Sequence, residues 1–281
     1  RPNPFGSNGG RRSSVSEQPP APMLEARELH FAYAGRPPLF VEFSWSVAAG
    51  ETWAVLGPSG CGKSTLLMLA AGLLRPQRGD MRVAGATLHR PRPRTGLILQ
   101  EYGLLPWATV RQNVALGLDI RRFYGPDGRH APQDERLEDH AARVDYWLER
   151  LGIAPLADAY PAQLSGGERQ RTAIARTLAL NPDLLLMDEP FSSLDAPTRE
   201  ALQILTLTLC HEQQLTVILV THALEEAAFV GQRILLLGRP PHHVPCIIEA
   251  PHPHEAAYRH TPAYQALCAE LRERLEAEEC S

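Results

Sequence analysis

The 281-residue chain alternates between short, wholly apolar runs and longer segments in which apolar residues recur at helical spacing. Four runs have the length and composition of buried β-strands. They cover residues 52–56, 97–99, 184–187 and 217–220. The helical segments cover residues 64–74, 167–180, 196–213 and 223–230. Because strands that alternate with helices form parallel sheets covered on both faces, the pattern predicts an α/β fold with a mostly parallel sheet.

Residues 101–180 differ from the rest of the chain because they contain no convincing strand pattern. They predict helices joined by loops, which we interpret as a helical subdomain. Within them, residues 121–136 (RRFYGPDGRHAPQDER) are polar and contain glycine and proline. We therefore expect an exposed loop there.

The two ends of the chain have patterns of their own. Residues 1–22 are rich in Pro, Gly, Ser and Arg, which predicts a disordered N-terminal tail. Residues 23–245 form the expected main domain, and residues 246–281 form a C-terminal extension. Leucines recur every four residues in that extension, at Leu267, Leu271 and Leu275. This spacing predicts an amphipathic helix that lies on the domain.

Charge and cysteine content narrow the classes of function. A formal net charge of −4 and a pI near 6.3 argue against nucleic acid as a partner, because nucleic-acid binders carry a basic surplus. The five scattered cysteines form no C-x-x-C pair, which fits a reducing cytosol. The longest apolar run, residues 66–74, is far shorter than the ~20 residues that span a bilayer. Any membrane association must therefore come through a partner.

Lys63 is the single lysine among 28 basic residues, and it lies in residues 57–65, GPSGCGKST. That segment fits the phosphate-binding loop pattern G-x-x-x-x-G-K-[ST]. Its glycines let backbone N–H groups turn toward phosphates, and the helix that follows directs its positive end at them. A tight loop has room for the compact lysine ammonium and not for the wide, rigid arginine fork. We expect Lys63 to reach the outer phosphates of a nucleotide and the Ser64 hydroxyl to hold Mg²⁺.

Two acidic residues, Asp188 and Glu189, follow the apolar strand 184–187 directly. An aspartate at the end of a buried strand can hold Mg²⁺ through water, and the next carboxylate can orient an attacking water. The alternative interpretation is a solvated turn with two acidic residues.

A second anion site is predicted at the start of the helix that runs to Ala179. Ser165 and Glu168 fit an S-x-x-E capping box, after which the free N–H groups and the dipole of the helix face outward. A well-capped helix without a ligand is the alternative. A chain with one phosphate-binding loop would use this second site if it faced the nucleotide of another subunit.

The order and spacing of these segments resemble the ATPase subunit of ABC transporters over about residues 23–240. The matching segments are residues 57–65 (Walker A), Gln100 (the Q-loop glutamine), 164–171 (the ABC signature), 184–189 (Walker B), 192–195 (the D-loop) and His222 (the switch histidine). The resemblance implies the P-loop NTPase fold of the ABC ATPases. Tyr33 is similar in position to the aromatic residue that stacks on adenine in the family, although Phe31 is a near neighbour and either could be a core residue.

The resemblance implies that two such subunits enclose two ATP molecules. Ser165, Gly166 and Gly167 of one subunit would contact the γ-phosphate that Lys63 of the other holds. The residues that the resemblance assigns to nucleotide binding are Tyr33, Gly57, Ser59, Gly60, Cys61, Gly62, Lys63, Ser64, Thr65, Ser165, Gly166, Gly167 and Asp195.

The resemblance also assigns roles in catalysis. Glu189 would be the general base, and His222 would stabilise the transition state. Gln100 would contact Mg²⁺ and the attacking water, and would couple ATP to the segment that follows it. Mg²⁺ would have the side chains of Ser64, Gln100 and Asp188 around it.

Residues 100–110 (QEYGLLPWATV) resemble the Q-loop region of bacterial importers for nitrate, sulfonates, taurine and related small molecules. Their apolar residues would suit a groove that receives a helix of a membrane subunit. The alternative is that Trp107 merely anchors the helical subdomain. The resemblance implies an ATP hydrolase that powers import of a small solute from the cytoplasmic face of the inner membrane. Its partners would be a second ATPase subunit, in the simplest case a second copy, the integral membrane permease and, indirectly, an extracytoplasmic solute-binding protein.

Two alternatives belong to other classes of function. A soluble ABC-type ATPase that acts on nucleic acid or ribosomes usually carries tandem ATPase domains, zinc fingers or long coiled coils, which this sequence does not show. A catalytically weak, regulatory nucleotide-binding module would not need Lys63, Glu189 and His222 together.

Several histidines lie among prolines near the C-terminus, at His242, His243, His252, His254 and His260. We expect them to be solvated, with metal binding as the alternative.

Overall fold

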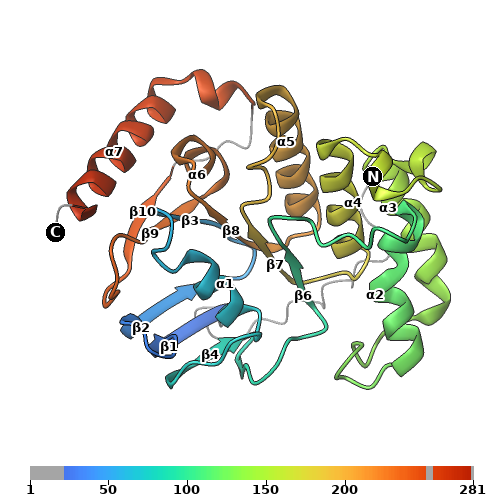
Figure 1. The fold of residues 1–281 in the computed structure, drawn as a ribbon, viewed down its shortest axis with the longest axis horizontal. Coiled ribbons are helices and arrows are strands. Elements are labelled where there is room, and N and C mark those ends of the chain that lie inside the picture. The colour runs from blue at the N-terminus through green and yellow to red at the C-terminus, as the bar shows by residue number, and fades with distance from the viewer. Residues whose placement is uncertain (1–21, 251–255, 280–281) are drawn as a thin grey trace, which may run out of the picture.

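The computed structural model describes residues 22–250 and 256–279, so the expected tail lies outside the described residues except for residue 22. Two sheets and the helices that pack on them form one part of the molecule. A further group of helices lies beside this part (Figure 1). Within the described residues, no helix is both long enough and apolar enough to cross a bilayer.

The larger sheet has six strands in the order β10-β9-β3-β8-β7-β6. Its strands are β3 (Thr52–Leu56), β6 (Thr95–Ile98), β7 (Leu184–Asp188), β8 (Thr216–Thr221), β9 (Arg233–Leu236) and β10 (Cys246–Glu249). All neighbours are parallel except β10, which pairs antiparallel with β9. The predicted α/β fold with a mostly parallel sheet is confirmed. Alternate side chains of β3 enter different cores, with Trp53 and Val55 on one face and Ala54 and Leu56 on the other.

A second, antiparallel sheet covers one face of the first. It has the order β2-β1-β4-β5 and consists of β1 (Leu24–Ala32), β2 (Pro38–Val47), β4 (Arg78–Val83) and β5 (Ala86–Thr87). Helix α1 (Lys63–Ala70) packs its leucines between the two sheets. The expected helix 64–74 is therefore too long. It ends early because Gly72 has φ +75° and its Cα lies against the backbone of Arg90, where a Cβ would come within 2.7 Å.

The other face of the parallel sheet is covered by α5 (Ala196–Glu212) and α6 (Leu224–Val230). Helix α7 (Pro262–Glu279), preceded by a 3₁₀ turn over Ala256–His260, packs on α6 (Figure 1). Leu267 and Leu271 are buried in this contact, as their spacing predicts, and the Tyr264 hydroxyl donates to the carbonyl of Glu225 at 3.0 Å. The domain boundary that we expect after residue 245 falls just before β10. The C-terminal extension therefore contributes a strand to the larger sheet, β10, as well as helix α7.

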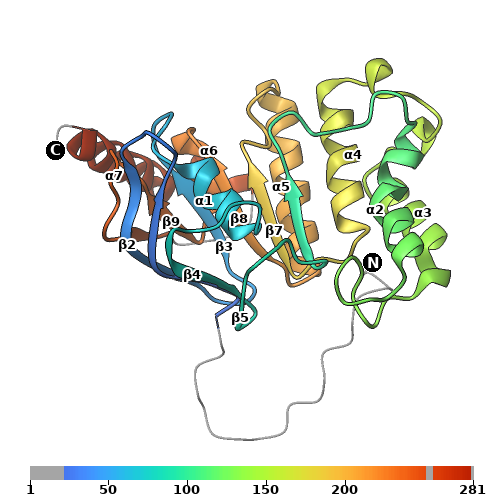
Figure 2. The same cartoon turned by 60° about the horizontal axis from the view of Figure 1, so that its bottom comes forward.

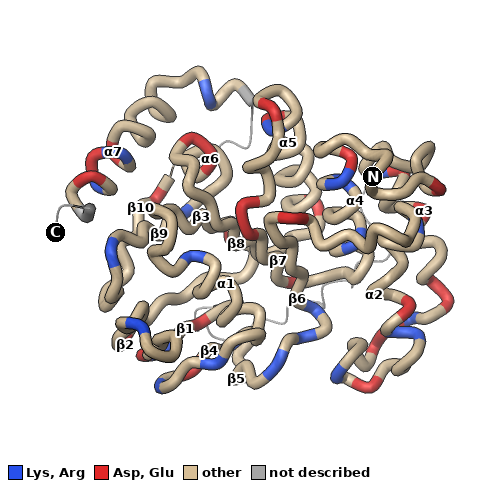
Figure 3. The backbone as a smooth tube through the Cα atoms, viewed as in Figure 1, with Lys and Arg blue, Asp and Glu red and all other residues tan. Residues whose placement is uncertain are grey.

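Residues 101–180 contain α2 (Val110–Tyr124), α3 (His140–Arg150) and α4 (Gly166–Leu178), linked by loops and 3₁₀ turns. The turns lie at Leu137–Asp139, Ala154–Leu156 and Pro161–Gln163. These helices form a group beyond the β6 edge of the parallel sheet (Figure 2). Acidic and basic residues both occur throughout this group and across the sheets (Figure 3). Some of them pair between helices, as Arg111 does with Asp145 at 2.6 Å.

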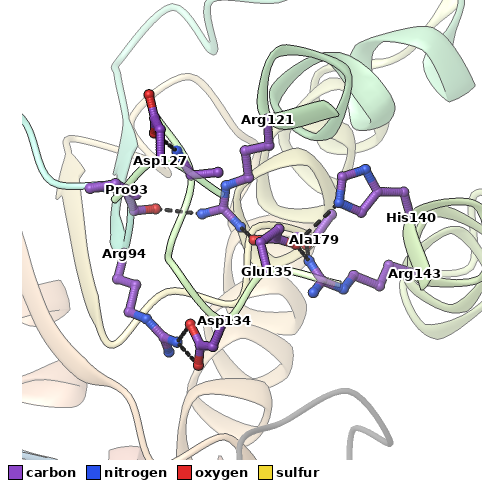
Figure 4. Close-up of polar contacts among 10 residues, drawn as sticks. Pro93, Arg94, Arg121, Asp127, Asp134, Glu135, His140, Arg143 and Ala179 are labelled. Atoms are coloured by element: carbon purple, nitrogen blue, oxygen red, sulfur yellow. Dashed lines mark hydrogen bonds and ion pairs between the residues drawn. The ribbon is translucent and has the colours of Figure 1, made fainter. Parts of the chain in front are cut away.

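The expectation that residues 121–136 form an exposed loop is wrong at both ends of the segment. Residues 121–124 are the last turn of α2, and the side chains of Arg121 and Glu135 are only 3% and 2% exposed. Figure 4 shows the Glu135 carboxylate at the centre of a polar cluster. It accepts from Arg121 and Arg143 at 2.6 Å each and from His140 Nε2 at 3.1 Å. These side chains are buried because each charge has a partner, while residues 126–129 between them are exposed.

The same cluster joins the helical group to the sheet. Arg121 also donates to the carbonyl of Pro93, just before β6, and Arg143 to the carbonyl of Ala179 at the end of α4 (Figure 4). Burial lowers the pKa of His140 below its usual value, which favours the neutral ring. Neutral His140 must then carry its proton on Nε2 to donate to Glu135.

We expect Glu135→Ala to lower the free energy of unfolding by about 3–5 kcal/mol, because two buried arginines would lose their carboxylate. The neighbouring Asp134→Ala is the matched control. It removes a carboxylate that pairs with Arg94 at the surface, and such pairs contribute at most ~1 kcal/mol. Urea unfolding of both variants checks the prediction, and equal losses would contradict it.

Candidate nucleotide-binding site

The register of the parallel sheet brings the ends of distant strands together. Leu56, the last residue of β3, pairs with Thr221 of β8 and with Leu236 of β9. Asp188, the last residue of β7, pairs with Val220. Since parallel strands end at the same edge, the segments that follow β3, β7 and β8 start side by side.

The loop after β3 wraps around the side chain of Lys63. The lysine is only 5% exposed, and its Nζ donates to the carbonyl oxygens of Gly57 and Pro58 at 2.8 Å each. Gly60 and Gly62 have φ values of +82° and +109°, a region that favours glycine. Gly62 caps α1 without a side-chain hydrogen bond, so the first N–H groups of the helix have no side-chain cap. This is the geometry of an anion-binding loop.

Ser64 and Asp188 form the oxygen-rich part of the site. The Ser64 hydroxyl donates to Asp188 Oδ1 at 3.0 Å, and Asp188 is 8% exposed. Burial raises the pKa of the Asp188 carboxyl, while the hydrogen bond from Ser64 opposes that shift. A hydroxyl and a carboxylate that are already in contact are hard oxygen ligands, and this donor set fits Mg²⁺.

Glu189, Gln100 and His222 come from three different elements and meet. One Glu189 carboxylate oxygen lies 3.0 Å from His222 Nδ1, and the other accepts from Gln100 Nε2 at 3.4 Å. Glu189 has φ +45°, which is uncommon for a residue with a side chain, and its N–H donates to the carbonyl of Val220 at 2.9 Å. The fold thus holds this carboxylate at the strand ends in a strained backbone conformation.

A cavity of about 410 Å³ opens over the loop and Glu189. Its lining residues are Tyr33, Arg36, Pro37, Leu39, Ser59, Gly60, Gly62, Lys63, Ser64, Thr65, Glu189 and Pro240. Tyr33 is 43% exposed at the rim, and its hydroxyl lies 3.1 Å from Thr65 Oγ1, whereas Phe31 is a buried core residue. Of the two aromatic residues that the sequence leaves open, Phe31 is therefore the one in the core.

Four residues of this lining were not expected from the sequence. Arg36 and Pro37 precede β2, Leu39 lies in β2, and Pro240 follows β9; no recognisable motif includes them. The one available signal was the short distance of Arg36 from Tyr33 along the chain. Arg36 supplies a second positive charge to the cavity, and Leu39 an apolar wall.

The segment that starts α4 has the expected capping box but does not line this cavity. Ser165 Oγ accepts from the N–H of Glu168 at 3.3 Å, and the Glu168 carboxylate accepts from the N–H and hydroxyl of Ser165. These bonds hold the pKa of Glu168 below its usual value. Gly166 and Gly167 pack closely on Leu194 and Thr198, where a Cβ would come within 3.2 and 2.8 Å.

Asp195 lies beside these glycines rather than in the cavity lining. It caps α5 by accepting from the N–H of Thr198 at 3.3 Å. Hydrogen bonds from the side chain and then the backbone of Thr198 lower the pKa of its carboxyl. The structure therefore places the expected site residues in two groups. Tyr33, the 57–65 loop, Asp188, Glu189, Gln100 and His222 form one group, and Ser165, Gly166, Gly167 and Asp195 form the other.

The expectation that His242 is solvated is wrong, because it is 8% exposed and lies behind the 57–65 loop. His243 and His260 are exposed, and His252 and His254 lie outside the described residues. Among the residues that the structure describes, no group of three or more His, Cys, Asp or Glu side chains is arranged to hold a metal ion.

Comparisons with known proteins agree with this geometry. Residues 40–192 match the ABC transporter family. The chain is 42% identical over 219 residues to the taurine import ATP-binding protein TauB of Escherichia coli (strain K12), covering 78% of this chain and 81% of that protein. It is 40% identical over 223 residues to an ATP-binding protein of Brucella abortus biovar 1 (strain 9-941), covering 79% of this chain and 81% of that one.

A solved structure gives the same result. The ATP-binding cassette MJ0796, described as a dimeric post-hydrolysis state bound to ADP and Pi, superposes with a TM-score of 0.67 at 27% identity. The match covers 82% of this chain and all of that one. The chain therefore belongs to the ABC transporter family, as an ATP-binding subunit that hydrolyses ATP.

Proposed function

We propose that this chain hydrolyses ATP to power import of a small solute, of the taurine, sulfonate or nitrate kind, through a membrane permease. One observation carries the hydrolytic part of the proposal. The Glu189 carboxylate is in contact with both His222 and Gln100 at the rim of a cavity that Lys63 and Ser64 line. The direction of transport and the class of solute are supported by the 42% identity to a taurine import protein.

The working form would be a dimer with two ATP molecules at its interface. Support comes from the separation of the two groups of site residues, because Ser165 and Gly167 lie outside the cavity that the phosphate-binding loop lines. The N–H groups at the start of α4 form an anion site. They would serve the γ-phosphate in the cavity of a partner subunit.

In this arrangement Lys63 would exchange its two carbonyl partners for the outer phosphates of ATP. Glu189 would accept the proton of the attacking water, and His222 would donate a hydrogen bond to the charge that develops on the γ-phosphate. Ser64, Asp188 and Gln100 would hold Mg²⁺, which when bound neutralises phosphate charge.

The Q-loop provides a route from the nucleotide to the membrane partner. Arg176 of α4 donates to the carbonyls of Tyr102 and Gly103 at 2.6 Å each, and the Tyr102 hydroxyl contacts Ser193 Oγ. Trp107 follows with 73% of its surface exposed. A side chain so exposed does not anchor the helical subdomain, so we assign Trp107 to the contact with the permease. Such a complex lies at the cytoplasmic face of the inner membrane, and a solute-binding protein delivers the solute from the other side.

We expect Lys63→Ala to weaken ATP binding by roughly 10- to 100-fold, since it removes a charge-assisted contact with the phosphates. The measurement is a titration with a fluorescent ATP analogue. Arg111→Ala, which removes a positive charge from α2 outside the cavity, should leave the affinity unchanged. Equal affinity in Lys63→Ala and the wild type would refute the phosphate-loop assignment.

Glu189→Gln should still bind ATP and should lower the hydrolysis rate by roughly 10²- to 10⁴-fold, because the amide cannot accept the proton of water. With ATP it should accumulate as a dimer in size-exclusion chromatography. Glu200→Gln, the same change at an exposed position of α5, is the control. Normal phosphate release by Glu189→Gln would mean that another residue is the base.

The transport part is tested by affinity purification of tagged Glu189→Gln with ATP from detergent-solubilised membranes. A permease with several membrane spans should co-purify, and adding Trp107→Ala should remove it without changing ATP affinity. A soluble dimer without a membrane partner, or one that carries ribosomes or DNA, would contradict import and favour the soluble alternative.

A further inference from the structure

The residues after β9 run alongside the phosphate-binding loop from Gly57 to Cys61. At the start of the loop, Leu237 donates its N–H to the carbonyl of Leu56 at 2.9 Å. Its own carbonyl lies so close to Gly57 that a Cβ there would come within 2.1 Å. Further along, Pro240 lines the cavity. This segment therefore lies against the loop and, at Pro240, against the cavity, although no nucleotide-binding motif includes it.

His242 lies at the end of this segment, and its backbone hydrogen bonds hold it in place. Its N–H donates to the carbonyl of Leu39 at 2.8 Å, and its carbonyl accepts from the N–H of Val41 at 3.0 Å. Its ring packs against Phe40 with the ring centroids 5.5 Å apart. His242 thereby joins β2 of the antiparallel sheet to the chain that leaves β9 of the parallel sheet. Because the backbone N–H and carbonyl of His242 are both hydrogen-bonded, its ring has little freedom to move.

The ring contacts the phosphate-binding loop directly. Nε2 of His242 lies 2.7 Å from the carbonyl oxygen of Cys61, and the two residues are 8% and 2% exposed. A carbonyl oxygen only accepts hydrogen bonds, so Nε2 must carry the proton. Removing one partner of such a buried hydrogen bond leaves the other partner unsatisfied, which costs free energy.

The orientation of the Cys61 carbonyl determines the orientation of the next N–H group. In a planar trans peptide, the C=O of one residue and the N–H of the next point in opposite directions. The Cys61 carbonyl points at His242, so the N–H of Gly62 points away from His242. Gly62 itself lines the cavity. Phe40 packs on Gly62, because its Cζ would lie 3.4 Å from a Cβ at that position.

We propose that His242 is a positioning residue for ATP, which holds the Cys61–Gly62 peptide so that the Gly62 N–H faces the phosphates. The proposal rests on the proposed use of the 57–65 loop for ATP and adds a residue that lies about 180 positions further along the chain. His242 touches the loop and not the cavity, since it is absent from the lining. It acts through the backbone of Cys61.

The test compares ADP binding to the full-length chain and its variants by isothermal titration calorimetry. His242→Phe keeps a ring against Phe40 and lacks the donor. We expect its Kd for ADP to rise about 2- to 12-fold, the equivalent of one neutral hydrogen bond. His242→Gln, whose amide nitrogen can reach the position of Nε2, should return the Kd to within about twofold of the wild type. His243→Phe, the same change at the exposed neighbour, should leave the Kd unchanged.

The readouts separate positioning from a merely structural role. A destabilised protein would show fewer binding sites per chain at an unchanged Kd, and that result would overturn the proposal. An equal rise in Kd for His242→Phe and His242→Gln would also overturn it, because the ring rather than its N–H would then matter. If His242→Phe does not fold, His242→Asn replaces it, since its shorter amide cannot reach the Cys61 carbonyl. Lys63→Ala, measured alongside, tests the loop assignment independently of His242.

Discussion

The whole site depends on one constraint, which is that the strands of a parallel sheet buried on both faces must end together. Apolar side chains of β3, β7 and β8 fill both cores, so these strands cannot slip by a residue without moving a core side chain to the wrong face. Their register therefore fixes which residues come next at the carboxyl edge. This is why Gly57, Glu189 and His222, spread over more than half of the chain, start side by side.

The same edge has a cost that the surrounding contacts must offset. The φ of +45° at Glu189 carries strain of order 1–3 kcal/mol. Its N–H is bonded to Val220, and its carbonyl accepts from both the N–H and the hydroxyl of Ser192. These bonds direct the carboxylate toward Gln100 and His222. Strain at a residue that is held on both sides is consistent with a group kept in place for chemistry rather than for folding.

The sequence predicts four of the six strands of the larger sheet and none of the strands of the antiparallel sheet, and burial explains the contrast. In β3 and β7 every residue is buried, so the apolar runs are continuous. In β1 and β2 the core residues recur at mixed spacings of two and three because bulges interrupt the alternation, with Glu28 and Glu42 in the left-handed region. A strict period of two, which identifies strands in a sequence, is therefore absent.

Buried polar residues are the second class that sequence reasoning placed wrongly, and the two examples have a common cause. Glu135 and His242 lie in segments rich in glycine, proline or charge, which are typical of solvated loops. Each is buried because it meets partners that lie elsewhere along the chain, Arg121 and Arg143 for the glutamate and the Cys61 carbonyl for the histidine. A polar group can be buried only where such partners complete its hydrogen bonds. The local composition of a segment carries no information about partners that lie elsewhere along the chain. Residues of this kind are therefore identified from the structure, where they join one sheet or subdomain to another.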